Sequence, residues 1–141
     1  MPIRTADAEW HGTLREGRGV MRLSTQATSG EFTWNSRFSD GGGTNPEEMV
    51  GAAHAGCFSM ALAGDLGNAG FKPELVRTSV NVHIEKLTSG WEITLIELTT
   101  GAKVPGVDNA TFQKIAEGTM ANCPVSKALK SVRISLSATL A

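Results

Sequence analysis

The sequence predicts one α+β domain spanning residues 1–141, and three observations lead to that prediction. A chain of 141 residues has about the commonest length for one domain and is too short for two independent cores. Short strand-like stretches fill its first 40 residues, and a long helical segment with clear end signals follows. Strand-like alternation then returns in two long stretches and again near the end. Strands grouped before and after helices in this way are typical of α+β proteins.

The first part of the chain predicts three short strands. Alternating stretches lie at residues 8–14, 19–24 and 31–38, and polar turns that contain glycine separate them at residues 15–17 and 27–30. Turn-linked strands this short favour an antiparallel meander.

A long helix is expected to begin at Pro46 and to run to about Ala69. Asn45 suits the cap, Pro46 suits the first helical position, and Glu48 stands three residues after the cap. Gly70 suits the position just past the end. Four glycines interrupt the interior, at positions 51, 56, 64 and 67. Because each costs up to about 1 kcal/mol relative to alanine, we expect another helix or sheet to approach closely on more than one side, which would make this helix central.

Two longer strands are expected after the helix, at residues 77–87 and 90–100. The first alternates cleanly, and the second is expected to turn Trp91, Ile93 and Leu95 inward. The polar residues between them predict a hairpin loop.

The rest of the chain predicts one or two helices and a last strand. Asp108 or Asn109 caps a helix whose apolar residues share one face. A short helix opens at Pro124 and runs to about Lys130, and residues 132–138 then alternate as a strand.

Composition excludes several classes of function. The chain carries 13 Lys and Arg against 14 Asp and Glu, a net charge of −1, and it has no basic block, so we expect no nucleic-acid partner. No apolar run approaches the roughly 20 residues that span a bilayer, and charges occupy the place of a signal peptide's apolar stretch. We therefore expect no membrane partner and a cytoplasmic location. The absence of tyrosine removes phenolic acids and nucleophiles.

The two cysteines, Cys57 and Cys123, are too few for a disulfide-stapled scaffold. Cys57 lies deep in the long helix, where the field of the helix dipole has faded, so a reactive thiol there needs an external cation. It is otherwise a small buried hydrophobe. Cys123 precedes Pro124 at a predicted helix start, where free backbone N–H groups favour a thiolate. Its alternative is a simple cap residue.

His54 stands three residues before Cys57 and therefore on the same helix face. This spacing permits a Cys–His pair of the kind that nucleophilic hydrolases use, and it suits an ordinary packed or exposed helix residue equally. The histidines and cysteines show none of the spacings typical of metal ligands. We expect no metal site.

Four stretches of the sequence together resemble the osmotically inducible protein C and organic hydroperoxide resistance (OsmC/Ohr) family, and the OsmC branch more closely. They are Arg37-Phe38, Gly43-Thr44-Asn45-Pro46-Glu47-Glu48, the run from Gly51 to Ala61, and Asn122-Cys123-Pro124-Val125-Ser126. The resemblance implies antiparallel sheets wrapped around a long central helix, in an intertwined homodimer.

The resemblance also implies an antioxidant stress-response enzyme, a thiol peroxidase that reduces organic hydroperoxides, and hydrogen peroxide more weakly, to alcohols. Cys57 matches the peroxidatic cysteine, which forms a sulfenic acid, and Cys123 matches the resolving cysteine, which closes a disulfide with it. Arg37 matches the active-site arginine and Glu47 the acid that orients it. The family implies no bound cofactor and an external thiol reductant, a dithiol of the lipoyl type in some members.

Helix geometry adds a hypothesis about the dimer. Glu47 and Cys57 are ten residues apart in one helix, which corresponds to about 15 Å of axial rise. Two such residues cannot easily touch within one chain, so the Arg37–Glu47 pair of one subunit is expected to complete the site around the cysteines of the other. Near the motif, Phe38, Met49, Phe58 and Met60 are candidates for an apolar substrate pocket or for ordinary core.

Two other functions stay open on the sequence alone. The cysteines suit a thiol redox sensor, or a small-ligand-binding stress protein, without significant turnover. The His54–Cys57 spacing suits a cysteine hydrolase. Substitution of Cys57 or of His54 separates these hypotheses.

Overall fold

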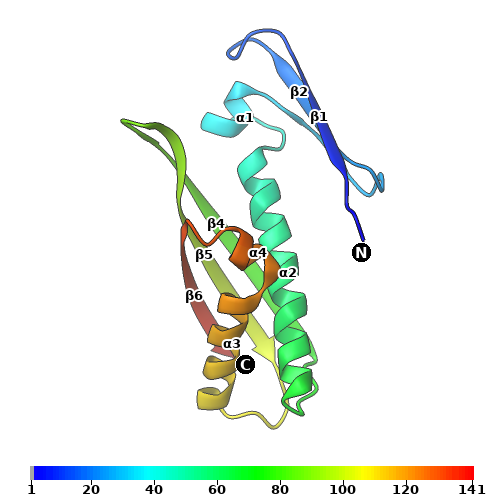
Figure 1. Cartoon of the computed structure of the whole chain (residues 1–141), viewed down its shortest axis with the longest axis vertical. Coiled ribbons are helices and arrows are strands. Elements are labelled where there is room, and N and C mark those ends of the chain that lie inside the picture. The colour runs from blue at the N-terminus through cyan, green and yellow to red at the C-terminus, as the bar shows by residue number, and fades with distance from the viewer. Residues whose placement is uncertain (1) are drawn as a thin grey trace. The chain divides into compact units, whose positions relative to one another are not determined.

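The protein was analysed as a computed structural model that describes residues 2–141 (Figure 1). Two three-stranded sheets and four helices make up this part of the chain. Contacts divide it into two compact units, Met1–Met49 and Val50–Ala141. The boundary falls inside a helix, α2 (Pro46–Asn68), and the single domain stays a prediction.

The N-terminal unit holds the expected antiparallel meander. Strands β1 (Ala6–His11), β2 (Arg18–Leu23) and β3 (Ser29–Phe32) lie side by side in chain order. The third predicted strand was too long, because its second half forms a short helix, α1 (Trp34–Phe38).

A capping box at Thr33 explains this helix. The Thr33 hydroxyl accepts the Ser36 N–H at 3.1 Å, and the Thr33 N–H donates to the Ser36 hydroxyl at 2.8 Å. This reciprocal pair satisfies two backbone donors that a strand would have left to a neighbouring strand. Local capping therefore favours a helix over the strand that the sequence predicts at these residues.

Helix α2 begins and ends as its sequence signals predict. The side chain of Asn45 accepts the N–H of Glu48 at 2.8 Å. At the other end Gly70 has a φ of +93°, and the N–H of Phe71 reaches the carbonyl of Leu66 at 3.0 Å. A glycine in this left-handed conformation, with a hydrogen bond closing back over it, is a Schellman ending.

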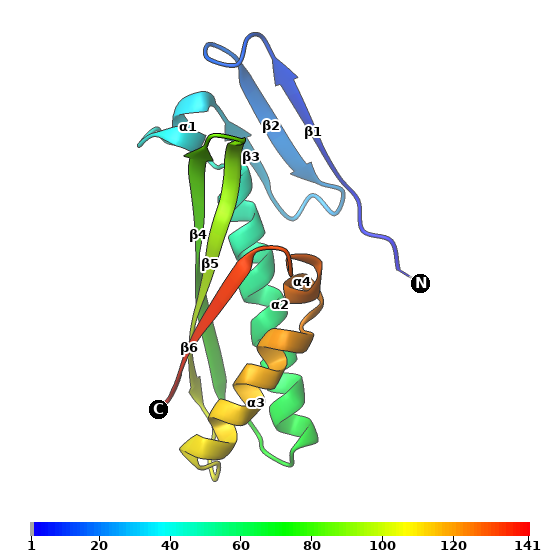
Figure 2. The same ribbon diagram turned by 60° about the vertical axis from the view of Figure 1, so that its left-hand side comes forward.

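The sheet of the C-terminal unit is mixed, which corrects the expectation of purely antiparallel sheets. Strands β4 (Leu75–Leu87) and β5 (Gly90–Lys103) form the predicted hairpin, but β6 (Arg133–Leu140) runs parallel to β5. A parallel neighbour requires a crossover, and helices α3 (Asn109–Asn122) and α4 (Pro124–Ala128) supply it. Figure 2 shows these helices and α2 on the same face of the sheet.

A β-bulge corrects one residue of the predicted inward face of β5, Leu95. His83 pairs with Leu95 and Ile84 with Ile93, so Thr94 is left over and the alternation changes phase there. Ile93 and Trp91 pair with Ile84 and Lys86 and so lie on the same face as Ile96, whereas Leu95 pairs with His83 on the opposite face. Trp91 is nevertheless 43% exposed. The fully buried residues of β5 instead begin at Ile96 and recur at every second position through Ala102.

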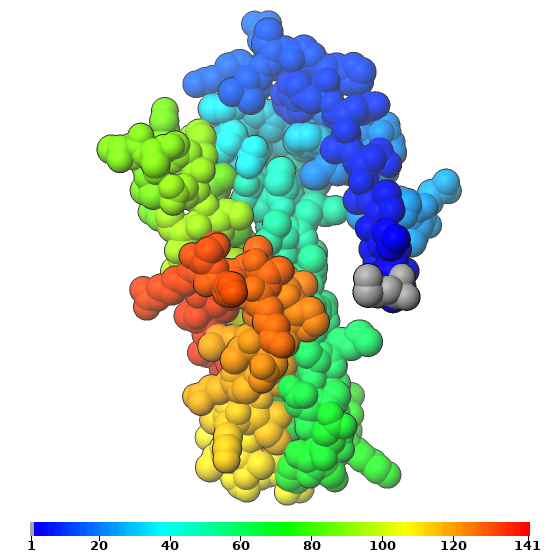
Figure 3. Space-filling model, viewed as in Figure 1, coloured from blue at the N-terminus to red at the C-terminus, as the bar shows by residue number. Residues whose placement is uncertain are grey.

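The core of the C-terminal unit lies between this sheet and the helices. In the space-filling view α3, yellow to orange, lies along the C-terminal part of α2, in green (Figure 3). The apolar side chains that meet there and lie almost wholly out of solvent are Phe58, Leu62, Leu66, Leu98, Ala102, Phe112 and Ala116. Cys123 belongs to the same cluster, and Cys57 packs against it. No helix among residues 2–141 is both long and apolar enough to cross a membrane.

Only part of the glycine content of α2 is explained by packing within the described chain. A Cβ atom at Gly51 would lie 3.4 Å from the side chain of Val82, so that position needs a small residue. At Gly56, Gly64 and Gly67 the same atom would meet nothing within 4 Å among the described residues. Among the described residues, the only glycine of α2 at which another element comes this close is therefore Gly51.

Candidate active site

The first element of the candidate site is an ion pair in the N-terminal unit. Nε and Nη2 of Arg37 donate to Oε1 of Glu47 at 3.1 Å and 2.9 Å, and Nε also lies 3.3 Å from Oε2. The Glu47 side chain is 8% exposed and that of Arg37 is 37% exposed. The carboxylate is therefore held inside while part of the guanidinium still faces solvent, where it can offer donors to a bound anion.

Local structure positions both partners. Arg37 lies in the last turn of α1, and Glu47 lies in the first turn of α2, where the positive end of the helix dipole favours a carboxylate. The side-chain amide of Asn45 donates to the carbonyl of Ser36 at 3.2 Å and fixes the end of α1 to the start of α2. Glu48, the other acid of the motif, is exposed.

An apolar pocket of about 220 Å³ lies beside Arg37 in the same unit. Two aromatic pairs shape it: the rings of Trp10 and Phe32 are 5.3 Å apart, and those of Trp34 and Phe38 are 4.4 Å apart. The residues that line it are Trp10, Leu14, Phe32, Thr33, Trp34, Arg37 and Phe38. It combines apolar walls with one guanidinium, a composition that suits an organic molecule with one polar group.

This pocket changes the list of predicted lining residues. Phe38 lines it, as expected. Phe58, by contrast, is fully buried in the core of the C-terminal unit, and Met60 is 81% exposed. Sequence reasoning missed Trp10 and Trp34, because they come from separate elements that only the folded unit brings together.

The second element of the candidate site is the pair of cysteines in the C-terminal unit. Both are free thiols, and their Sγ atoms lie 3.1 Å apart. Cys57 lies on α2, and Cys123 stands between α3 and α4, ending one helix and beginning the next. Cys123 is 1% exposed, and Cys57 is partly exposed. A nucleophilic sulfur at this separation is already in near-attack range of the other.

The two thiols differ in their acidity. Burial raises the pKa of Cys57, and the hydrogen bond with Cys123 raises it further. Burial also opposes ionisation of Cys123, yet the N–H groups of Ser126 and Val125, the Ser126 hydroxyl and the Cys57 thiol together bring its pKa below the ordinary value. Within one chain, the surroundings therefore favour ionisation of Cys123 over ionisation of Cys57.

A buried histidine on the helix that carries Cys57 contacts the helix that follows Cys123. His54, on α2, is fully buried, and its Nε2 lies 2.8 Å from the hydroxyl of Ser126 on α4. Its Nδ1 has no hydrogen-bond partner among the described residues. Neither nitrogen bonds Cys57, which a Cys57–His54 hydrolase would require. Burial lowers the pKa of His54 and keeps the ring neutral.

The structure thus brings the four predicted site residues together as two pairs, Arg37 with Glu47 and Cys57 with Cys123. Ser126 was missed as a contributor, although a signal was present: His54 precedes one cysteine by three residues, and Ser126 follows the other by three. Across residues 2–141, no group of three or more His, Cys, Asp or Glu side chains is arranged to hold a metal ion.

Comparison with known proteins identifies the family. The model of the family described as OsmC-like protein matches residues 39–137. Peroxiredoxin OsmC of Escherichia coli (strain K12) is 41% identical to the chain over 129 residues, which cover 91% of this chain and 90% of that protein. The chain belongs to the OsmC-like protein family. A further relative, the organic hydroperoxide resistance protein of Xanthomonas axonopodis pv. citri, is 32% identical over 130 residues, covering 90% and 87% of the two chains.

Solved structures confirm the fold expected of an OsmC-like protein. An OsmC-like protein from Mycoplasma pneumoniae superposes with a TM-score of 0.76 at 13% identity, covering 99% of this chain and 97% of that one. The organic hydroperoxide resistance protein OsmC from Legionella pneumophila gives a TM-score of 0.71 at 18% identity, with 100% and 99% covered. Likeness at such low identity concerns the α+β fold alone.

Proposed function

We propose that this OsmC-like protein is a cysteine-based peroxidase that reduces organic hydroperoxides to alcohols, and hydrogen peroxide more weakly. The observation that carries the proposal is the pair of free thiols with sulfurs 3.1 Å apart. Two relatives that match about nine-tenths of the chain support a peroxide-related redox role through their names, peroxiredoxin OsmC and organic hydroperoxide resistance protein.

The reaction balances with these residues and an external dithiol. The Cys57 thiolate attacks one peroxide oxygen, the O–O bond breaks, and the alkoxide takes up a proton and leaves as the alcohol. The Cys57 sulfenic acid then condenses with Cys123: an S–S bond forms, the S–O bond breaks, and water leaves. A dithiol, of the lipoyl type by analogy with some family members, reduces the disulfide by exchange and is itself oxidised.

Activation of Cys57 calls for a cation, and we assign that role to Arg37. The groups that shift the pKa of Cys57 most are burial, Cys123 and the backbone of Val125, and none of these carries a positive charge. A guanidinium beside the thiol would lower its pKa and would stabilise the charge that develops on the leaving alkoxide. Glu47, with three contacts to Arg37, would hold the guanidinium in a fixed orientation.

The pocket beside Arg37 supports the preference for organic substrates. Its aromatic walls would remove the alkyl or aryl group of a hydroperoxide from water, whereas hydrogen peroxide has no apolar group to bury. The guanidinium at its side would meet the peroxide oxygens. The same arrangement gives Trp10 and Trp34 a role in specificity.

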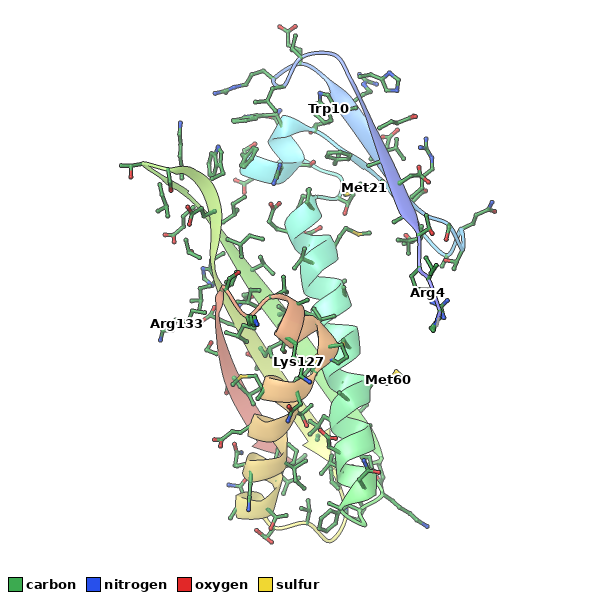
Figure 4. All side chains as sticks on the ribbon, in the orientation of Figure 1. Arg4, Trp10, Met21, Met60, Lys127 and Arg133 are labelled. Atoms are coloured by element: carbon green, nitrogen blue, oxygen red, sulfur yellow. The ribbon has the colours of Figure 1, made fainter. Side chains whose placement is uncertain are left out.

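The helix α2 supports a homodimer in which each site draws on both subunits. Gly56 and Gly64 have open space around them within the chain, and Met60 between them is 81% exposed and points away from the helix (Figure 4). A second copy packed on this face would account for small residues that cost helix stability. The Arg37–Glu47 pair of one subunit would then complete the site around the cysteines of its partner.

Peroxide consumption with dithiothreitol, and then with a dihydrolipoamide system, tests the proposal. Cumene and tert-butyl hydroperoxide should be consumed catalytically and faster than hydrogen peroxide. Cys57→Ser should abolish consumption, whereas Cys123→Ser should allow one turnover, after which mass spectrometry shows Cys57 oxidised beyond the sulfenic acid. Stoichiometric disulfide formation without turnover would overturn the enzyme and favour a redox sensor. Recycling by a dithiol needs a compartment that keeps thiols reduced, which is the reason to expect the cytoplasm.

Mixing two inactive variants tests whether the site is shared between subunits. Arg37→Ala and Cys57→Ser are each expected to be inactive as homodimers. After subunit exchange, half of the dimers carry one site with an intact arginine and an intact cysteine, so about a quarter of wild-type activity should return. No recovery, despite heterodimers shown by native mass spectrometry, would place both residues in the same chain.

A further inference from the structure

His54 and Ser126 connect the two segments that carry the reactive cysteines. The bond between His54 Nε2 and the Ser126 hydroxyl is 2.8 Å long, and both residues are buried. Ser126 stands three residues after Cys123, which is the cap residue of α4, and its backbone N–H and hydroxyl lower the pKa of that thiol. The side chains of a helix's cap residue and of its third residue lie next to each other, so the hydroxyl that the imidazole contacts lies beside the thiol of the resolving cysteine.

The surroundings of the ring decide the direction of the hydrogen bonds along this path. Nδ1 has no partner among the described residues, and a buried N–H without an acceptor is costlier than a lone pair without a donor. The proton of the neutral ring therefore belongs on Nε2, where it is donated to the oxygen of Ser126. The hydroxyl hydrogen of Ser126 is then free to be donated to Cys123.

We propose that His54 is a positioning residue that acts through Ser126, orienting the Ser126 hydroxyl as a donor to Cys123 and so favouring the thiolate of the resolving cysteine for its attack on the Cys57 sulfenic acid. The observation that carries this is the buried contact between His54 and Ser126, together with the unpartnered Nδ1. The opposite directions in which the fold moves the pKa values of Cys57 and Cys123 agree with it.

The charged side chains on the surrounding elements either bond to other residues or face solvent. On α2, Asp65 accepts a hydrogen bond from Thr119 of α3 at 2.6 Å. On α4, Lys127 is exposed at the surface (Figure 4). The groups that bear on the Cys123 thiol are the Cys57 thiol, the Ser126 hydroxyl and the N–H groups of Val125 and Ser126. None of these is an ion, so a polarised hydroxyl has a measurable share in stabilising the thiolate.

The role concerns the second chemical step and rests on the proposed peroxidase function. The Cys123 thiolate attacks the sulfur of the Cys57 sulfenic acid, the S–S bond forms, and the S–O bond breaks. The departing hydroxide takes up one proton, equal to the one that Cys123 lost on ionising, and leaves as water. His54 exchanges no proton in this step and stays neutral throughout.

The acidity of Cys123 can be measured without any peroxide. In the Cys57→Ser background, thiolate absorbance near 240 nm against pH reports Cys123 alone. Ser126→Ala should raise its pKa by about one unit. His54→Phe, which fills the site without a donor, should raise it by a smaller amount, whereas His54→Gln, whose amide can still donate to Ser126, should keep the original value. Circular dichroism verifies that each variant is folded.

A double substitution separates action through Ser126 from a general loss of packing. If His54 works through that hydroxyl, His54→Phe should change the pKa of Cys123 no further once Ser126 is alanine. Equal pKa shifts with and without the serine would overturn the proposal. So would an unchanged pKa in Ser126→Ala, or the Nδ1–H tautomer in long-range ¹H–¹⁵N spectra, because that tautomer draws the Ser126 hydrogen toward the ring.

The closing rate of the disulfide supplies the functional readout. In a single turnover followed by acid quench and mass spectrometry, Ser126→Ala should slow the conversion of sulfenic acid to disulfide about threefold at neutral pH, because the smaller thiolate fraction is partly offset by a stronger nucleophile. Formation of the sulfenic acid itself should be unchanged. If wild-type protein consumes no peroxide, the peroxidase proposal fails, while the pKa and tautomer measurements still decide the role of His54.

Discussion

The two pairs of candidate site residues are built in opposite ways. Arg37 and Glu47 stand ten residues apart, on either side of one loop, and make three hydrogen-bonding contacts. Cys57 and Cys123 stand 66 residues apart and make one contact, at 3.1 Å. The charged pair therefore needs little more than α1, a loop and the first turn of α2. The thiol pair needs α2, α3 and α4 packed on their sheet.

This difference suits the two pairs to different duties in the proposed reaction. The contacts within the charged pair fix the direction of a guanidinium, which is what stabilisation of a leaving alkoxide requires. In the proposed cycle the thiols instead approach within bonding distance and separate again at each turnover, since a disulfide is about 2 Å long. One weak contact between thiols is well suited to a bond that forms and breaks.

The largest expected effect is on the first chemical step and separates the two pairs. Arg37→Ala should slow oxidation of Cys57 by organic hydroperoxide about 10²- to 10³-fold, because the oriented donors to the leaving oxygen are lost. Glu47→Gln should slow it about tenfold, the equivalent of one weakened hydrogen bond. Single-turnover kinetics measure both.

The second step and a distant arginine serve as controls for that prediction. Closure of the disulfide from a preformed sulfenic acid should proceed at the wild-type rate in Arg37→Ala. Arg22→Ala removes an arginine of the same unit that pairs with Asp7 and Glu9 on the surface, and it should leave both steps unchanged. If Cys57 were oxidised at the wild-type rate in Arg37→Ala, Arg37 would have no part in the mechanism.

The same contrast explains what could be predicted from the sequence. Features set by neighbours in the chain were predicted well: the cap at Asn45, the ending at Gly70, and the hairpin between β4 and β5. The antiparallel expectation failed at β6, because strand pairing across a crossover leaves no local pattern. The prediction that Leu95 faces inward was wrong because the bulge at Thr94 depends on how two strands pair with each other.

The candidate site follows the same rule. The four residues were identified through motifs, and each motif is local. The contact between His54 and Ser126 joins segments 72 residues apart, so spacing from each cysteine pointed at both residues without linking them. The aromatic pocket beside Arg37 likewise joins β1, β3 and α1, and the sequence placed Trp34 in a strand that is in fact a helix.

The second prediction concerns the pH dependence of stability, which the two thiols should move in opposite directions. The fold raises the pKa of Cys57, so its contribution is full below the pKa of the unfolded thiol, about 8.5, and is lost as pH rises through the higher folded pKa. The fold lowers the pKa of Cys123, so its contribution is present above about pH 8.5 and is lost as pH falls through the lower folded pKa.

Urea unfolding of reduced single-cysteine variants at pH 7 and pH 10 measures these contributions, with Arg37→Ala in every variant so that the proposed cation does not act on Cys57. Relative to the variant lacking both cysteines, Cys123→Ser, which keeps Cys57, should lose stability between the two pH values. Cys57→Ser, which keeps Cys123, should gain it. If the urea midpoints of both variants shifted in the same direction between the two pH values, the fold would not move the two thiol pKa values in opposite directions.

The smallest expected effect is on stability, and it tests whether a second subunit packs against α2, as a site shared between subunits requires. Gly64 on α2 and Gly118 on α3 both lie inside helices, where an added Cβ atom would meet nothing within 4 Å among the described residues. In an isolated chain, alanine at either position should stabilise the fold by up to about 1 kcal/mol, because it is the better helix former.

If a second copy packs against α2, Gly64→Ala should instead destabilise the dimer, while Gly118→Ala should still stabilise the chain. Thermal unfolding and sedimentation of the two variants measure the difference. Equal stabilisation at both positions would show that no second copy packs against the glycines of α2. It would also count against a site in which the Arg37–Glu47 pair serves a partner subunit.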